Sequence, residues 1–279
     1  PEPRPGGNGA AGPVGLVVGG GLLGLEAARA LRLLGLSVHV VEMAQRLMPL
    51  QVDEGGGALL RRLVEELGVT LHLGTFAAGV RPAADDGEDA PMCATLGDGT
   101  ELAADLVVFA AGVRPRDQLA RAAGLAIGAR GGVAVDAGCR TQDPAVFAIG
   151  ECACVEGRVY GLVAPGYAMA TVVAQRLLGG DGELGAADTA TKLKLLGVDV
   201  ASFGDALATA DGALEVTVND PVTGCYAKLV LSDDAATLLG GVLVGDASKY
   251  AALRPLVGRA LPADPLAMLA PAGGGTGAV

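Results

Sequence analysis

The chain has 279 residues, enough for two or three domains with buried cores. Its 31 acidic and 20 basic residues give a formal net charge of −11, so nucleic acid and anionic membranes are not expected partners. No run of about 20 uncharged apolar residues is present, so no membrane-spanning helix is predicted. Five cysteines without a disulfide-framework spacing, and no secretory signal, favour a reducing cytoplasm.

The first pattern along the chain is a strand, a glycine-rich turn and a helix. An apolar run leads into Gly19, Gly21 and Gly24, which have the G-x-G-x-x-G spacing. Gly19 permits a tight turn, Gly21 lets the backbone approach a pyrophosphate, and Gly24 lets the helix pack closely on the sheet. The phosphates would meet free N–H groups at the helix start, at Leu22 and Leu23. This unit predicts a dinucleotide-binding site.

An acid closes the unit at the end of the second apolar run. Glu42 follows the run 38–41, where a carboxylate can accept hydrogen bonds from both ribose hydroxyls of an adenosine. Its negative charge would repel a 2′-phosphate, so Glu42 favours NADH over NADPH. The alternative to a dinucleotide-binding site is that the three glycines belong to an ordinary loop, but this leaves the preceding strand and the following acid unexplained.

Alternation of strands and helices continues and then changes character. Asp53 is predicted to cap a second helix, which leads to a strand over 69–73. Residues 76–103 contain short strands and an Asp-Gly hairpin signal, which predicts a small antiparallel meander. A buried strand within 104–112 is expected to return to the parallel sheet.

A different arrangement begins near residue 114. We expect a short helix, a strand over 132–135, a strand over 146–151 and a helix from about 164 to 178. After a glycine-rich linker, the last third shows alternating strands and a helix, which indicates a separate α+β module. The glycine-rich tail 271–277 is expected to be disordered.

Two further motifs narrow the interpretation. Residues 109–115, Phe-Ala-Ala-Gly-Val-Arg-Pro, and residues 141–151 resemble the two later signatures of the pyridine nucleotide-disulfide oxidoreductase family. The resemblance implies that the first motif marks the return from an NAD domain to an FAD domain, with Gly112 lining the cleft. It implies that the second motif brings Gly150 and Glu151 to the FAD ribityl chain. Glu151 stands where the family usually has Asp, so its contact is expected to be shifted or water-mediated.

The last module is similar to one branch of that family. Residues 189–205, 226–231 and 238–246 resemble the segment that follows the flavin domain in NADH-dependent assimilatory nitrite reductase large subunits. The resemblance implies hydride transfer from NADH (or NADPH) to FAD, with iron–sulfur and sirohaem centres only in regions outside this chain. The FAD-binding G-x-G-x-x-G is expected upstream of Pro1. Related flavoenzymes have an acid near the nicotinamide at the place of Glu26, which implies a positioning role for this residue.

The predicted fold class is therefore α/β, in three parts. Residues 10–113 are expected to form a Rossmann-like NAD(P)-binding domain with an antiparallel meander. Residues 114–182 would be the C-terminal half of an FAD-binding domain, and residues 188–270 a small α+β C-terminal module. The expected partners are NADH and the remaining domains of the full-length enzyme. The expected function is the electron-input segment of the nitrite reductase large subunit.

Two alternatives stay open. One is a flavoprotein like the NADH-dependent rubredoxin or ferredoxin reductases, and the other is a non-catalytic dinucleotide-binding module. No catalytic side chain and no metal ligand set is predicted. His39 and His72 lie in apolar alternating runs and are interpreted as structural. Cys152 and Cys154 form a C-x-C pair, expected on one face of a strand and interpreted as buried thiols.

Overall fold

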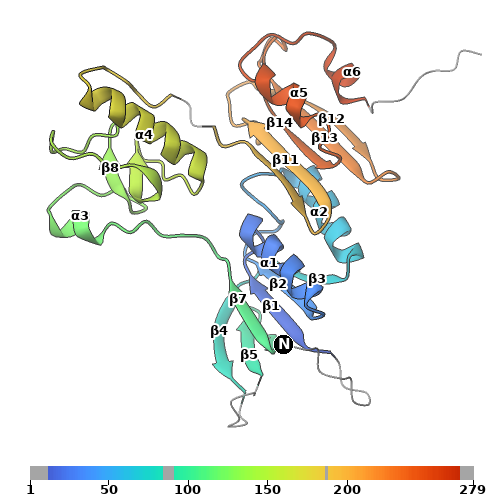
Figure 1. Ribbon diagram of the computed structural model, residues 1–279. Coiled ribbons are helices and arrows are strands. Elements are labelled where there is room, and N and C mark those ends of the chain that lie inside the picture. Colours follow the sequence, from blue (N-terminus) through green and yellow to red (C-terminus); the bar gives the residue numbers. More distant parts are fainter. Residues whose placement is uncertain (1–11, 84–90, 186–187, 271–279) are drawn as a thin grey trace, which may run out of the picture. The chain divides into compact units, whose positions relative to one another are not determined.

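The computed structural model describes residues 12–83, 91–185 and 188–270 (Figure 1). The tail predicted to be disordered, 271–277, lies outside these described residues. The described chain forms two compact units. The first unit contains the described residues 12–83, 91–111 and 190–270, and the second contains residues 112–185 and 188–189. Within the described ranges, no helix has both the length and the apolar character needed to cross a membrane.

The first unit is built on a parallel sheet with strand order β3-β2-β1-β7. Its strands are β1 (Val14–Val18), β2 (Ser37–Glu42), β3 (Val69–Leu73) and β7 (Leu106–Phe109), and each neighbouring pair is parallel. Two helices connect the first three strands: α1 (Leu22–Leu33) and α2 (Glu54–Glu66). This is the predicted Rossmann-like arrangement, which is confirmed.

Helix positions follow from apolar spacing and capping. Helix α1 buries Leu25, Ala28 and Leu31, three residues apart, so one stripe of the helix faces the sheet. Helix α2 begins after Asp53, whose Oδ1 accepts a hydrogen bond from the Gly56 N–H at 3.2 Å. This bond satisfies one of the free donors at a helix start. The predicted Asp53 cap is confirmed.

The predicted meander is also confirmed. It consists of β4 (Ala77–Pro82), β5 (Met92–Leu96) and β6 (Glu101–Ala104), paired antiparallel in the order β4-β5-β6. Leu16 and Val41 from the parallel sheet pack with Ala94, Leu96 and Ala104 in one buried cluster. The meander therefore covers one face of the parallel sheet.

The C-terminal module consists of an antiparallel sheet with short helices. The strand order is β10-β11-β14-β13-β12. The strands are β10 (Thr191–Leu195), β11 (Val198–Gly204), β12 (Leu214–Asp220), β13 (Cys225–Leu231) and β14 (Leu238–Gly245). The helical segments are α5 (Tyr250–Leu253), the 3-10 turn η2 (Arg254–Leu256) and α6 (Pro265–Leu269). The predicted α+β module is confirmed.

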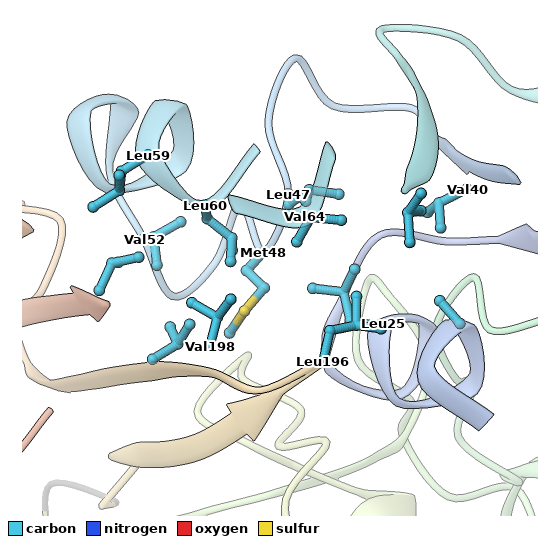
Figure 2. Packing of buried hydrophobic residues seen from close by; sticks show 14 of the residues in the cluster. Leu25, Val40, Leu47, Met48, Val52, Leu59, Leu60, Val64, Leu196 and Val198 are labelled. Atoms are coloured by element: carbon cyan, nitrogen blue, oxygen red, sulfur yellow. The ribbon is translucent and has the colours of Figure 1, made fainter. Parts of the chain in front are cut away.

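The module and the dinucleotide fold share one hydrophobic core within the first unit. Figure 2 shows Met48 lying near Val198 of the module, and Leu25 of α1 lying beside Leu196 of the module. All belong to a single cluster of buried residues. Burial of apolar side chains contributes about 25 cal/mol per Å² of area removed from water, so this shared core holds the two parts together.

The second unit is smaller. It contains α3 (Gln118–Ala122), β8 (Val133–Val135), the 3-10 turn η1 (Gly150–Cys152), β9 (Ala153–Val155) and α4 (Val163–Leu177). Strands β8 and β9 pair in parallel. Their inward side chains, Val135, Ala153 and Val155, pack with Met169 and Val172 of α4.

The predicted strand over 146–151 is wrong. In this segment only Phe147 makes a ladder contact, an isolated bridge with Arg140, and Gly150 begins the 3-10 turn η1. Ile149 is extended, with φ −135° and ψ 160°, but a strand forms only where a neighbouring strand supplies ladder hydrogen bonds. Gly150 then has φ +77°, which ends the extended run.

Candidate coenzyme-binding site

The glycine turn between β1 and α1 has the geometry that the spacing predicts. Gly19 has φ +116°, and a Cβ there would collide with the Ala110 carbonyl. A Cβ on Gly24 would collide with the Gly19 carbonyl, so the helix lies directly on the turn. A Cβ on Gly21 would meet nothing within 4 Å. Gly19 and Gly24 are therefore needed for folding, whereas Gly21 faces open space.

The start of α1 leaves backbone donors at this open space. The first helical hydrogen bond runs from the Leu25 N–H to the Gly21 carbonyl at 3.0 Å. Gly21 is the N-cap and makes no side-chain cap bond, so the N–H groups of Leu22 and Leu23 have no partner within the helix. A helix start of this kind attracts anions, since its N–H groups and its dipole both favour negative charge.

Glu42 lies beside the turn at the end of β2. Its Oε2 accepts a hydrogen bond from the Gly20 N–H at 2.6 Å, and its Oε1 accepts one from the Ala44 N–H at 2.8 Å. An ionised carboxylate offers roughly four acceptor sites, so these two bonds leave capacity for hydroxyl donors. The backbone bonds orient the carboxylate. Sequence analysis singled out Glu42 but missed Gly20, because a middle glycine of the motif has no assigned task.

Glu26 lies on the exposed side of α1, one turn after Gly21. Its side chain makes no contact that distinguishes a role toward a nicotinamide from that of a solvated helix charge. The positioning role of Glu26 stays a prediction.

The remaining predicted residues lie in the second unit. Gly112 has φ +91° and is exposed, and a Cβ there would meet nothing within 4 Å. Gly150 donates its N–H to the Met169 sulfur at 3.2 Å, which ties η1 to α4. Glu151 is exposed on η1. The structure thus brings the turn residues and Glu42 together in one unit, and holds Gly112, Gly150 and Glu151 in the other.

Two histidines meet in a way that sequence analysis missed. His39 Nδ1 and His72 Nε2 lie 3.0 Å apart on the neighbouring strands β2 and β3, and the rings are nearly parallel, with an interplanar angle of 15°. Burial, and then the charge of His72, hold the pKa of His39 below its ordinary value. The adjacency of strands two and three in a Rossmann sheet was the signal for this pairing. Among the described residues no group of three metal-ligating side chains occurs.

The expected shared face of Cys152 and Cys154 is wrong. Cys154 is buried in β9, as expected, but Cys152 is only partly buried, so the expectation of a buried thiol is wrong for Cys152. Cys152 ends the 3-10 turn η1, where its Sγ donates to the Ile149 carbonyl at 3.4 Å. The turn interrupts the two-residue period of a strand, so the side chains do not follow one alternation. All five cysteines are free thiols.

Comparison with protein-family profiles identifies the family to which this chain is similar. The profile described as "Pyridine nucleotide-disulphide oxidoreductase" matches residues 11–176. The chain belongs to this family. The resemblance predicted from the later motifs is thereby confirmed. A second profile, "Rubredoxin NAD+ reductase C-terminal domain", matches residues 190–260, so this family member carries a module of that type.

Similar proteins refine the position within the family. The chain is 49% identical to the nitrite reductase [NAD(P)H] large subunit of Klebsiella oxytoca over 92% of its length. It is 46% identical to the nitrite reductase (NADH) large subunit of Escherichia coli K12 over 94%. It covers 27% and 31% of these two relatives. A ferredoxin reductase structure from Rhodopseudomonas palustris is 28% identical with a TM-score of 0.74, over 89% of this chain and 61% of that one.

Proposed function

We propose that this chain is the electron-input segment of an NADH-dependent nitrite reductase large subunit. It would bind NADH at the turn that follows β1 and orient it for hydride transfer to FAD. The observation that carries the proposal is the contrast among the motif glycines. Added carbon atoms collide at Gly19 and Gly24, while Gly21 faces free space at a helix start. Such space beside free N–H groups suits a pyrophosphate.

The electrostatics support NADH as the substrate. The pyrophosphate would lie against the N–H groups of Leu22 and Leu23, which a chain of net charge −11 needs in order to hold an anion locally. Glu42, oriented by Gly20 and Ala44, would accept the ribose hydroxyls. Because Glu42 is an acid, the site should discriminate against the 2′-phosphate of NADPH. Glu26 would face the nicotinamide end.

The second unit would serve the flavin. When bound, FAD supplies the acceptor of the hydride, and the protein contributes binding and orientation. We propose that Gly112 lines the cofactor-binding cleft and that Gly150 and Glu151 lie near the ribityl chain of FAD. Gly150 has a positive φ, +77°, and a Cβ added there would meet nothing within 4 Å, which leaves room for close approach. The ADP part of FAD would be held by a part of the longer protein.

The proposed functional segments keep the predicted boundaries. Residues 10–113 would bind NADH, residues 114–182 would contribute to the FAD site, and residues 188–270 would form the C-terminal module. The iron–sulfur and sirohaem centres that reduce nitrite, and further partner domains, would lie in the remainder of the protein. We also propose a cytoplasmic location, which the five free thiols support.

Direct binding tests the first step. Purified chain titrated with NADH should show saturable binding, followed by the fluorescence of the reduced coenzyme, and NADPH should bind more weakly. Absence of saturable NADH binding would remove the proposal. Nitrite consumption driven by NADH should then appear in the longer protein that contains this segment.

A ferredoxin or rubredoxin reductase is the second candidate. The match of residues 190–260 to a rubredoxin reductase module favours it. The identities of 49% and 46% to nitrite reductase large subunits over nearly the whole chain favour the first candidate. Reduction of a ferredoxin by the longer protein, without nitrite reduction, would select the second. A colourless longer protein that binds NADH would select the third candidate, a non-catalytic dinucleotide-binding module.

A further inference from the structure

We propose that the C-terminal module positions the glycine turn between β1 and α1 indirectly, through the loop that supports this turn. Lys228 is the positioning residue through which the module acts. The proposal rests on the proposed NADH site, because it concerns the loop that supports that site. This loop, residues 43–52, connects β2 to α2 and is called the support loop below. No residue of the module needs to touch the coenzyme.

The support loop holds the middle residue, Gly20, of the glycine turn between β1 and α1. The Met48 N–H donates to the Gly20 carbonyl at 3.0 Å, and the Leu47 side chain lies against Gly20, where an added Cβ would come within 2.7 Å of it. The Glu42 carboxylate accepts from the N–H groups of Gly20 and Ala44. Both polar backbone groups of Gly20 are therefore bound by the support loop or by the acid that precedes it.

The support loop needs help to keep its shape. Met48 has φ +48°, a left-handed conformation that side chains disfavour. Within the loop, Arg46 donates from Nε to the Val52 carbonyl at 2.9 Å and from Nη2 to the Pro49 carbonyl at 3.1 Å. These bonds close the loop on itself. They do not fix its position relative to the rest of the fold.

The module adds to the backbone bonds that join the loop to Gly20 and Gly74 by burying its apolar side chains. Met48 and Val52 are fully buried, in the same cluster as Val198, Val200 and Val242 of the module. Figure 2 shows Met48 pointing toward Val198. The rear of the support loop is thus covered by the sheet of the module.

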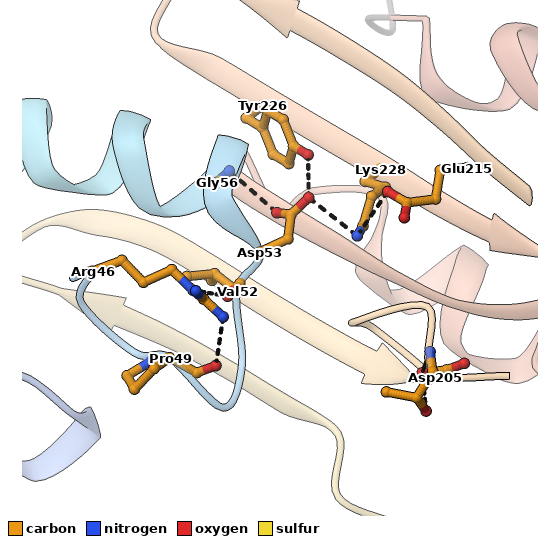
Figure 3. A network of polar contacts seen from close by, with 10 residues as sticks. Arg46, Pro49, Val52, Asp53, Gly56, Asp205, Glu215, Tyr226 and Lys228 are labelled. Carbon is orange, nitrogen blue, oxygen red and sulfur yellow. Dashed lines mark hydrogen bonds and ion pairs between the residues drawn. The ribbon is translucent and has the colours of Figure 1, made fainter. Parts of the chain in front are cut away.

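A group of polar contacts among Asp53, Tyr226, Lys228 and Glu215, called the clamp below, fixes the end of the support loop. Asp53 follows it directly, and its Oδ2 accepts a hydrogen bond from Tyr226 Oη at 2.5 Å and lies 3.1 Å from Lys228 Nζ (Figure 3). Lys228 is 1% exposed and also lies 3.1 Å from Glu215 Oε2. A buried ammonium group requires its carboxylate partners, so Lys228 holds Asp53 in one place.

Loosening this clamp should weaken coenzyme binding. A turn that is already ordered loses less conformational entropy when a ligand binds, and a freed support loop would have to be ordered at that moment. Lys228→Met removes the charge and keeps the length of the side chain. We expect NADH to bind roughly three- to tenfold more weakly, which lies within the range that remote coupled mutations produce. Amide hydrogen exchange at Met48 should accelerate.

Lys194→Met is the matched control. Lys194 is exposed on β10 of the same module, so this variant makes the same chemical change without touching the clamp. It should bind NADH as the parent does. Tyr226→Phe, which removes only the hydroxyl that bonds Asp53, is the second clamp variant and should weaken binding in the same direction. Unfolding curves of each variant define conditions under which the protein is fully folded.

The outcomes separate the two proposals. If the parent protein does not bind NADH, both the proposed function and this inference are contradicted. If the parent binds and the clamp variants, fully folded, bind equally well with unchanged exchange at Met48, only the inference is overturned. Should Lys228→Met fail to fold, Tyr226→Phe decides by the same two measurements. Equal weakening in Lys194→Met would also overturn the role of the clamp.

Discussion

The Glu42 carboxylate accepts a 2.6 Å hydrogen bond from the Gly20 N–H, which joins the acid at the end of β2 to the turn that follows β1. Two elements of the motif that are distant in sequence thus form one rigid group. The acid is oriented before any coenzyme arrives, which lowers the entropy lost on binding.

Gly21→Val should abolish NADH binding and leave the fold intact. A Cβ at Gly21 would meet no protein atom within 4 Å, so the change should alter the free energy of unfolding by less than about 1 kcal/mol. The isopropyl group would occupy the space proposed for the pyrophosphate. Titration with NADH and urea unfolding check both statements. As a contrast, Gly24→Ala should destabilise the fold by about 3 kcal/mol or more, because its Cβ collides with the Gly19 carbonyl.

Glu42→Arg should shift the coenzyme preference toward NADPH. The variant loses the acceptor for the ribose hydroxyls and gains a cation that can pair with a 2′-phosphate. It also leaves the N–H groups of Gly20 and Ala44 without their acceptor, at a cost of about 1–3 kcal/mol for each group that stays buried. The ratio of the NADH and NADPH dissociation constants is the measurement. Unchanged affinity for both nucleotides would count against the role of Glu42.

The Asp53–Tyr226 bond predicts that the free energy of unfolding has a plateau at intermediate pH and falls at both acid and alkaline pH. Burial alone would raise the pKa of Asp53, but the bonds from Tyr226 and Lys228 outweigh it, so this pKa lies below its ordinary value. The contribution of Asp53 is therefore present above about pH 4 and is lost as the pH falls through the folded pKa. Burial and the bond to Asp53 raise the pKa of Tyr226. Its contribution is present below about pH 10 and is lost at higher pH.

Urea unfolding from pH 3 to 11 checks this plateau. Tyr226→Phe should lower the plateau and flatten its alkaline side, since the phenol that ionises in the unfolded chain is gone. An alkaline decline of equal steepness in Tyr226→Phe and in the parent would assign that decline to other groups.

How much was predictable depends on how local each feature is. The glycine turn, the Glu42 position and the Asp53 cap are set by short-range spacing, so the sequence pattern was sufficient for them. The extended segment ending at Ile149 was misassigned because a strand needs a neighbour, which local apolar character does not reveal. The clamp between Asp53 and Lys228 joins residues far apart in the chain. Each of them alone indicates only an ordinary helix cap or strand charge.

The His39–His72 pair predicts a loss of stability on mild acidification. Burial and the neighbouring His72 lower the pKa of His39 in the fold, so the unfolded chain takes up a proton at about pH 6.5 and the folded chain takes it up only at a lower pH. Stability from this residue is therefore present above that pH and falls as the pH drops through it. His39→Gln keeps a polar side chain but cannot titrate, so its free energy of unfolding should fall less between pH 8 and pH 5.5 than that of the parent. Urea unfolding of both proteins at these two pH values measures the difference, and identical slopes would assign the acid sensitivity to other groups.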